Sequence, residues 1–508
     1  MPIVPALAGP LPEAGVAAAA LLAACALVLR SRRRRALAAG AALVLAPALL
    51  LADVWDSPQL RFAHRSPLAA AGLALMALAA VAGLAALMRR RPSLLPLLAV
   101  AAVPFRVPIE VAGDTANLLV PLYLVVGAGA AAWIWEAVRE PEARERGAGA
   151  LEWALAAYLA LYGIAAAWSP DFSKALQNVV FFYVPFAVLF ALLARTRWTG
   201  TLLRRCLLVL AGLAVAFACI GFFEYATKTL LLNPKLLVSN DFHAYFRVNS
   251  VFFDPNIFGR FLVVVMLLIA TVLLDSRRGR TVAGLLAVLA VLWGGLVLTL
   301  SQSSLVGLLA GLAVLAALRW PPRRVLAACA GLAALGVAFV ALFPSVTGID
   351  VRSFDRLNAD SSGRADLISG GLELWQERPV LGWGSGSFAR QYRRLGKGSA
   401  QQAVSASHTI PITVAAEQGV VGLLAYLALL AAALARLFPG ARGSTPRTAL
   451  AAAFVALLVH TLVYAAFLED PLAWALLAVA SALALAPRGK PAPRRGEGAA
   501  PAPGNVVA

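Results

Sequence analysis

The sequence predicts an all-α fold, a polytopic membrane bundle of about 12 to 15 transmembrane helices. Of its 508 residues, 61% are hydrophobic and the mean hydropathy is +0.81, whereas soluble domains are close to half apolar. The apolar residues gather in runs of roughly 20, the length that a helix needs to cross about 30 Å of hydrocarbon. Ten-residue segments of alternating hydrophobicity are absent from the sequence, which argues against a membrane barrel.

Fifteen apolar runs bounded by polar or basic residues are predicted as membrane spans. They are 13–30, 36–52, 67–88, 92–106, 116–135, 149–168, 177–194, 203–224, 257–275, 281–299, 302–318, 323–343, 409–436, 446–467 and 471–487. The run 92–106 is short and contains proline, which favours a half-helix at this position.

The basic residues between the spans predict the orientation, because cytoplasmic loops are enriched in Lys and Arg. Alternate threading places every short basic cluster on one side: 30–35, 89–91, 139–146, 195–205, 277–280, 319–324, 436–447 and 488–495. We therefore expect a membrane protein with its N-terminus outside and its C-terminus in the cytoplasm. Most Arg and Lys residues lie in these clusters, so the net charge of +19 reflects the membrane topology and does not indicate nucleic-acid binding.

Two long loops, 225–256 and 344–408, fall on the predicted outer side of the membrane. In the second loop, residues 363–377 are predicted as a short amphipathic helix on the outer leaflet, with a possible cap from Ser361 or Ser362. Its apolar face comprises Leu367, Ile368, Gly371, Leu372 and Trp375. The chain is thus divided into N-terminal transmembrane helices (1–224), a second membrane region holding both loops (225–486) and a disordered cytoplasmic tail (487–508).

Three arginines at the edge of the membrane are candidate ligands for phosphate. Arg247 and Arg364 lie in the long loops near the membrane face, and Arg260 lies just inside a span. A guanidinium is always charged and binds phosphate oxygens as a fork, and such a charge inside a bilayer is usually functional. The alternative is a snorkelling side chain or a loop salt bridge, such as Arg364 with Asp366 or Arg247 with Asp241.

His408 stands at the start of a long apolar helix. If Ser407 caps that helix, its positive end favours a neutral imidazole that can accept a proton, and it also attracts phosphate. The alternative is an interfacial histidine bonded to a carbonyl group. His460 lies in the middle of a span and is interpreted as structural.

Five residues are candidate substrate contacts, and Arg260 is one of them. Glu417 lies nine residues after His408, about 13 Å deeper, where it is also expected to support helix packing. Asn256 belongs to the turn Asp254-Pro255-Asn256, which could equally cap the span that follows. The full set is Asn256, Arg260, Trp375, Arg378 and Glu417.

Several missing motifs limit the possible chemistry. The sequence has no phosphate-binding loop of the G-x-x-x-x-G-K-[ST] type, no Asp-x-Asp metal motif and no Cys or His cluster. We therefore expect neither a metal nor a cofactor, and we interpret the glycines at 382, 384 and 386 as a turn. A transferase on the outer face would need a donor already activated in the membrane.

Four segments, in this order, resemble the bacterial O-antigen ligase and O-antigen polymerase superfamily. They are RVNSVFFDPNIFG (247–259), LTLSQSSLVGLL (298–309), GRADLISGGLELWQERPVLGWGSGSF (363–388), and His408 followed by EQGVVG (417–422). The chain departs from the family pattern at Gln302 and Ser303, where an arginine is common, and at Thr409, where an asparagine is common. The resemblance covers roughly residues 245–486.

The resemblance implies a metal-independent, inverting membrane glycosyltransferase whose catalytic region is 225–486. It also implies a multi-pass protein of the bacterial inner membrane, with a periplasmic N-terminus and a cytoplasmic C-terminus. Its donor would be a glycan on undecaprenyl diphosphate, and its acceptor would be lipid A-core. By motif, Arg247 and Arg364 would hold the diphosphate, and His408 would be the base or would position the acceptor. The polyprenyl tail would lie between the spans 257–275 and 409–436.

Other functions remain open at this point. The same motifs fit an O-antigen or exopolysaccharide polymerase and a protein O-oligosaccharyltransferase. A transporter or flippase for a lipid-linked glycan would carry its essential charges deep in broken helices, whereas these charges cluster at the outer mouth. A scaffold without catalytic activity is a further alternative.

Overall fold

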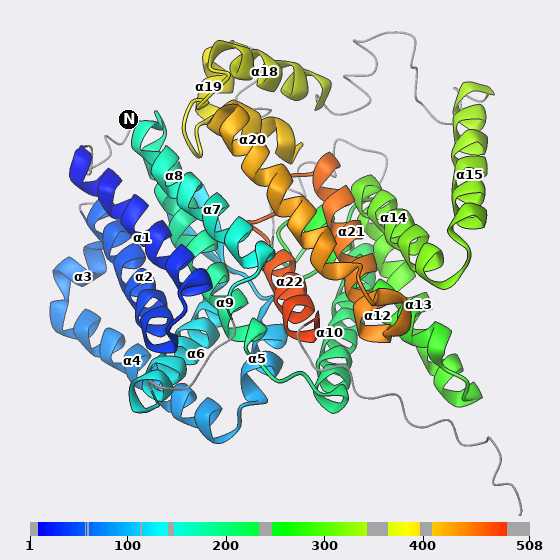
Figure 1. Ribbon diagram of the computed structural model, residues 1–508, viewed down its shortest axis with the longest axis horizontal. Helices are drawn as coiled ribbons and strands as arrows, with labels where there is room; N and C mark the ends of the chain where they lie inside the picture. The colour runs from blue at the N-terminus through cyan, green and yellow to red at the C-terminus, as the bar shows by residue number, and fades with distance from the viewer. Residues whose placement is uncertain are drawn as a thin grey trace, which may run out of the picture.

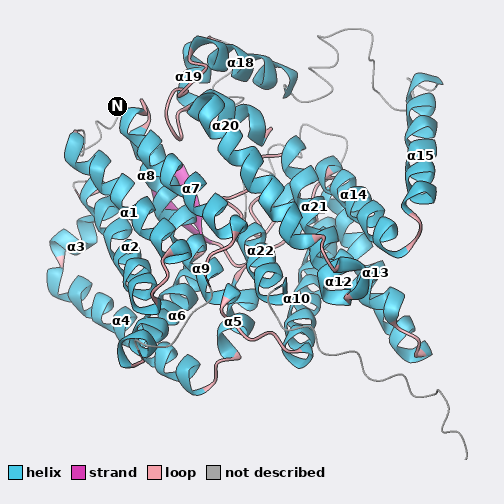
Figure 2. Ribbon diagram, in the orientation of Figure 1, coloured by secondary structure: helices cyan, strands magenta, loops and turns pink. Residues whose placement is uncertain are grey.

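The computed structural model describes residues 9–55, 57, 60–111, 114–140, 147–232, 246–342, 364–396 and 409–484. These residues form a bundle of helices joined by short loops, with one small strand pair inside it (Figures 1 and 2). Among them, twelve helices are long and apolar enough to cross a membrane. The protein is therefore a polytopic membrane helix bundle, as the hydropathy of the sequence predicts.

The described residues of the first half supply helices α1 to α10 and one strand pair. These are α1 (Pro10–Val28), α2 (Arg32–Asp53), α3 (Arg61–Arg65), α4 (Pro67–Arg90), α5 (Leu94–Ala102), the strands β1 (Val107–Val111) and β2 (Asp114–Leu118), α6 (Val120–Arg139), α7 (Ala150–Ala165), the continuous segment α8–η3–α9 (Phe172–Asn178, Val179–Tyr183, Val184–Ala194) and α10 (Gly200–Thr227). A 3-10 turn, η2 (Ala166–Trp168), follows α7 directly.

The second half supplies the remaining helices. These are α12 (Pro255–Asp275), α13 (Gly279–Thr299), α14 (Gln302–Arg319), α15 (Pro322–Leu342), α18 (Arg364–Glu377), α19 (Phe388–Arg394), α20 (Ile410–Leu437), the turn η4 (Ala441–Gly443), α21 (Thr445–Val463) and α22 (Pro471–Ala484). The predicted tail 487–508 lies outside the described residues.

Every predicted span corresponds to a helix in the structure. The run 92–106 contains only the nine-residue α5, which at about 1.5 Å per residue is too short to cross the membrane, so the expected half-helix is confirmed. After α5, the chain forms an antiparallel hairpin in which Val107 pairs with Leu118. This hairpin was not predicted, because apolar content alone does not separate short strands from helix ends.

The helix α12 lies at the centre of the second half and packs against α10, α13, α14 and α21. The two halves of the chain also pack together, since α7 contacts α20 and α9 contacts α22. The helices on both sides of residue 224 therefore form one bundle. The predicted boundary between 1–224 and 225–486 stays a prediction. In Figure 1, α15 stands apart at one edge, and most of its described residues are exposed.

The predicted amphipathic helix is α18, which lies with α19 over one end of the bundle (Figure 1). Its buried face differs from the predicted one: Leu367, Gly370, Gly371 and Leu374 are buried, whereas Leu372 is 36% exposed. The buried side packs on α19 and α20, where Phe388, Tyr392 and Ala416 complete a small apolar cluster. The predicted face was therefore right at Leu367 and Gly371 and wrong at Leu372, because contacts with α19 and α20 select the buried side.

Candidate active site

The first turn of α12 is the starting point of a polar cluster. Asp254 caps the helix, since one of its carboxylate oxygens accepts hydrogen bonds from the backbone N–H groups of Asn256 (2.6 Å) and Ile257 (3.3 Å). Pro255 stands in the first turn, where the absence of an N–H group costs nothing. The other oxygen of Asp254 accepts a hydrogen bond from the hydroxyl of Tyr464 (2.7 Å), which ties α12 to the end of α21.

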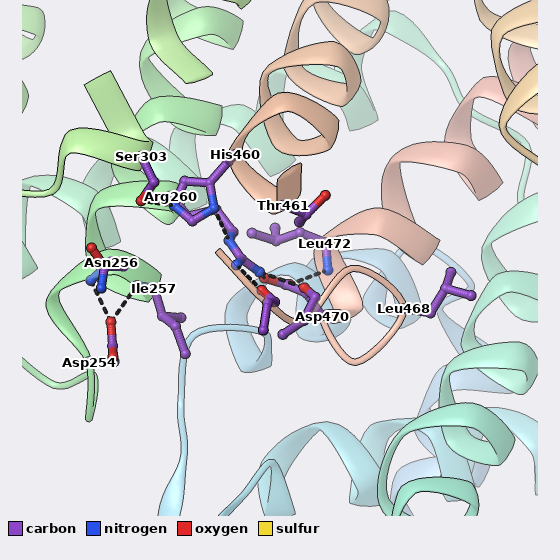
Figure 3. Close-up of polar contacts among 12 residues, drawn as sticks. Asp254, Asn256, Ile257, Arg260, Ser303, His460, Thr461, Leu468, Asp470 and Leu472 are labelled. Carbon is purple, nitrogen blue, oxygen red and sulfur yellow. Dashed lines mark hydrogen bonds and ion pairs between the residues drawn. The ribbon is translucent and has the colours of Figure 1, made fainter. Parts of the chain in front are cut away.

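Arg260 is buried in this cluster, with 1% of its side chain exposed (Figure 3). Its guanidinium donates to the Asp470 carboxylate (2.7 Å) and to the carbonyl groups of Ala465 and Ala466 (both 2.8 Å). Its Nε donates to Nδ1 of His460 (3.3 Å). Four of the five N–H groups of this arginine therefore bond to protein, and Arg260 fixes the segment between α21 and α22.

A chain of hydrogen bonds continues from His460 towards Asn256. Because Nδ1 of His460 accepts from Arg260, the proton of a neutral ring lies on Nε2, which contacts the Ser303 hydroxyl at 3.2 Å. Ser303 lies 3.1 Å from the Ser301 hydroxyl, and Ser301 donates to Oδ1 of Asn256 (2.8 Å). The turn between α13 and α14 thus joins α21 to α12 through small hydroxyl groups.

Arg247 lies beside the same asparagine, at the entry to α12. Its Nη2 donates to Oδ1 of Asn256 (3.3 Å) and its Nε to the carbonyl of Thr299 (3.0 Å). The segment that carries Arg247 is held by Glu224, a fully buried carboxylate that accepts from the N–H groups of Asn249 (3.1 Å) and Ser250 (2.8 Å). Glu224 therefore positions Arg247 from the last turn of α10.

Two ionisable side chains next to this cluster were not singled out from the sequence. Arg106 follows α5; burial lowers its pKa, and the nearby Asp470 carboxylate opposes that shift. Its Nε has no hydrogen-bond partner among the described residues. Burial also raises the pKa of Glu469, against the opposing charges of Lys174 and Arg260. Both positions could have been noticed as charges flanking apolar runs.

A glycine-rich loop, 379–388, docks against a kink in α20. The kink is at Gly419 (φ 62°), where the N–H of Val420 bonds to the carbonyl of Pro379 (2.8 Å). The carboxylate of Glu417 accepts from the N–H groups of Gly386 (2.8 Å) and Phe388 (3.1 Å). Glu417 is therefore engaged in holding this loop on α20.

The other sequence candidates lie around α18 and the start of α20. The indole of Trp375 donates to the carbonyl of Pro379 (3.2 Å), and the exposed Arg378 stacks on Trp383, 3.9 Å from the ring centroid. Arg364 is the first residue of α18, and its side chain lies outside the described part of the structure.

His408 and Ser407 also lie outside the described residues. The cap of α20 is Thr409, so the helix begins two residues later than a cap at Ser407 requires. The Thr409 hydroxyl donates to the carbonyl of Leu462 (3.1 Å) at the end of α21, between His460 and Tyr464 in sequence. The start of α20 is therefore anchored beside the polar cluster.

The structure thus brings Arg247, Asn256 and Arg260 together and adds Arg106, His460, Tyr464 and Asp470. Glu417, Trp375 and Arg378 belong instead to the contacts of the loop 379–388 and of α18. The N-terminus of α12 is already capped by Asp254, and Arg260 is paired with Asp470, so the positive charge that remains for an anion here comes from Arg106 and Arg247. Positive charge at this position can offset charge that develops on a leaving diphosphate.

A family model described as O-Antigen ligase (Wzy_C) matches residues 286–427. The matched region runs from within α13 into α20 and includes Arg364, Trp375, Arg378, His408 and Glu417. The matched region is shorter than the resemblance seen in the sequence, which covers roughly 245–486. Arg247, Asn256 and Arg260 precede it in the chain and are not part of the match. A search of curated proteins found no match. Over this region, the chain is similar to the O-antigen ligase superfamily.

Proposed function

We propose that this protein is a glycosyltransferase that moves a glycan from undecaprenyl diphosphate to lipid A-core at the periplasmic face of the bacterial inner membrane. The family match supports an O-antigen ligase or polymerase type of activity in general. The observation that carries the more specific proposal is the convergence of Arg106, Arg247 and Arg260 at the N-terminal end of α12.

An apolar cavity of about 390 Å³ supports a lipid-linked donor. On α12 it is lined by Val264, Leu268 and Val272, which follow Arg260 at intervals of four residues and so lie on nearly the same helical face. It is also lined by Leu472, whose N–H bonds to Asp470, the partner of Arg260. The apolar lining therefore begins one turn beyond Arg260 and extends about 12 Å along α12, from Val264 to Val272.

This cavity suits a polyprenyl tail whose diphosphate lies at the arginines. It is bounded by α12, as expected from the sequence, and by residues of α5, α9, α10, α21 and α22. The span 409–436, which was expected to form its other wall, does not line it. The tail would therefore lie on the side of α12 that faces α22.

In the proposed reaction, an acceptor hydroxyl oxygen attacks the anomeric carbon and the bond to the diphosphate oxygen breaks on the opposite face of the sugar. The configuration at that carbon inverts. His408 takes the hydroxyl proton, and Arg247 and Arg364 stabilise the departing diphosphate. Neither ATP nor a divalent metal is required, because the donor is already activated.

The test is to supply purified protein in lipid nanodiscs with a polyprenyl-diphosphate-linked glycan, EDTA and no ATP. Lipid A-core, a second lipid-linked glycan and an acceptor peptide are offered separately, and products are identified by mass spectrometry. The proposal predicts glycan on lipid A-core. Products on the second glycan or the peptide alone would instead identify a polymerase or a protein transferase, and movement of donor across a vesicle membrane without transfer would identify a transporter.

The role of Arg247 is tested by Arg247→Lys, which keeps the charge but loses the fork. We expect kcat/KM for the donor to fall by about 10- to 100-fold, the loss expected for a hydrogen bond to a charged group. Arg393→Lys is the matched control, because Arg393 is exposed on α19. Equal donor kinetics in both variants would remove Arg247 from the proposed donor site.

A further inference from the structure

A second cavity, of about 450 Å³, lies between α4, α5, α6, α9 and the start of α10, and no residue of the polar cluster lines it. Three arginines line it, Arg195, Arg197 and Arg205, against one carboxylate, Glu136. Glu136 is already paired with Arg32 (2.8 Å) and Arg195 (3.5 Å). The cavity therefore keeps an excess of positive charge.

Arg197 and Arg205 are the cations open to a ligand. Both side chains are exposed, and neither forms an ion pair or hydrogen bond with the residues that the structure describes. Thr196, Thr199 and Thr201 also line the cavity. Thr201 lies in the first turn of α10, a helix of 28 residues, where a backbone N–H group has no partner within the helix.

The other part of the lining is apolar, with contributions from Met88, Leu95, Leu192 and Leu202. A cavity with guanidinium and hydroxyl groups beside an apolar wall matches a molecule with a phosphate at one end and hydrocarbon at the other. Free phosphate would leave the apolar wall without a partner.

Tryptophan and arginine side chains around the cavity mark the level of a bilayer interface. Arg195 stacks on Trp133 at 4.8 Å, and Arg89 and Arg139 stack on Trp135 at 4.5 and 4.4 Å. Tryptophan is enriched where the hydrocarbon meets the headgroups. In Figure 1, α4, α5 and α6 gather at the end of the bundle opposite α18 and α19.

We propose that this cavity binds the phosphate headgroup of an anionic membrane lipid, in the leaflet that faces the basic loops. Basic pockets between transmembrane helices on this side are suited to such headgroups. The site is separate from the proposed transferase centre, and it does not depend on the proposed function.

The experiment measures lipid binding to the purified full chain by native mass spectrometry, with phosphatidylglycerol and phosphatidylethanolamine offered at equal concentration. We expect phosphatidylglycerol to bind preferentially, and its affinity to fall about thirty-fold in the variant Arg197→Gln/Arg205→Gln, which loses two cations at the surface. Inorganic phosphate at the same concentration is expected not to displace the lipid.

The matched control is Arg277→Gln/Arg278→Gln, which removes the same charge from exposed arginines between α12 and α13. This control should bind phosphatidylglycerol as the parent does, and both variants should unfold at the parent temperature in detergent. The proposal is wrong if the two lipids bind the parent equally, if both double variants bind alike, or if inorganic phosphate displaces the lipid. The comparison of lipids on the parent requires no variant to fold.

Discussion

The pairing of Arg260 with Asp470 determines how the polar cluster is held together. Both side chains are almost fully buried, at 1% and 4% exposed, and their charged atoms are 2.7 Å apart. Removing both charges from water is costly, and the additional bonds to Ala465, Ala466 and His460 offset part of that cost. Removing only one of the two charges therefore destabilises the protein more than removing both.

This pairing gives a prediction about stability. Arg260→Met leaves the Asp470 carboxylate buried without its partner, which should cost about 3–5 kcal/mol. Adding Asp470→Asn should recover part of the loss, because the asparagine is neutral and its side-chain oxygen can still accept from Leu472 N–H, as Asp470 does. Unfolding temperatures of the detergent-purified single and double variants test this. If Arg260→Met and the double variant unfold at the same temperature, the two charges are not energetically coupled.

At the residue scale, the sequence predicted local contacts better than distant ones. The cap at Asp254 follows from the order Asp-Pro-Asn before an apolar run, because a cap bonds only to the next two or three residues. The partner of Arg260 is 210 residues away, and no periodicity encodes that pair. The same reason explains why Arg106 and the contacts of His460 were missed.

At the element scale, the loop 379–388 depends on three glycines in the left-handed region. Gly382, Gly384 and Gly386 have φ of 67°, 94° and 76°. A Cβ at Gly384 would lie 2.4 Å from the backbone of Ser169, just after α7 and η2. The sequence predicted a turn here, but only the structure shows that this turn fits between α20 and the N-terminal helices, because the fit depends on backbone approach.

Gly384→Ala is therefore predicted to destabilise the protein more than Gly396→Ala. Both positions have positive φ, at 94° and 66°, but no atom lies within 4 Å of a Cβ at Gly396. Backbone strain should cost about 1–2 kcal/mol at either position, and the clash at Gly384 about 1–3 kcal/mol more. Unfolding temperatures measure the difference. Equal losses would show that the loop is not tightly docked.

At the scale of the whole molecule, the number and order of the helices were predictable because the bilayer sets the length of every span. The way that the helices pack was not, since lipid-facing and protein-facing surfaces are both apolar. The contacts of Ser385 illustrate this: its N–H and hydroxyl bond to the carbonyl groups of Ala165 (3.3 Å) and Tyr162 (2.8 Å) in α7. The N-terminal helices thus support the loop next to α20.

The proposed orientation predicts which loops a reagent can reach. In a background with the four native cysteines replaced by alanine, a cysteine at Arg393 on α19 should react with a membrane-impermeant maleimide in intact cells. A cysteine at Arg278, in the basic segment before α13, should react only after the membrane is permeabilised. The reverse pattern of labelling would invert the proposed topology and place the polar cluster on the cytoplasmic side.

The most direct measurement is the rate of glycan transfer by His408→Ala, compared with the parent, from a polyprenyl-diphosphate donor to lipid A-core without ATP or metal. If His408 takes the proton of the acceptor hydroxyl beside the arginines at α12, the rate should fall by about 10²–10⁴-fold with donor binding retained. Transfer by the variant at the parental rate would contradict that role and the proposed active site.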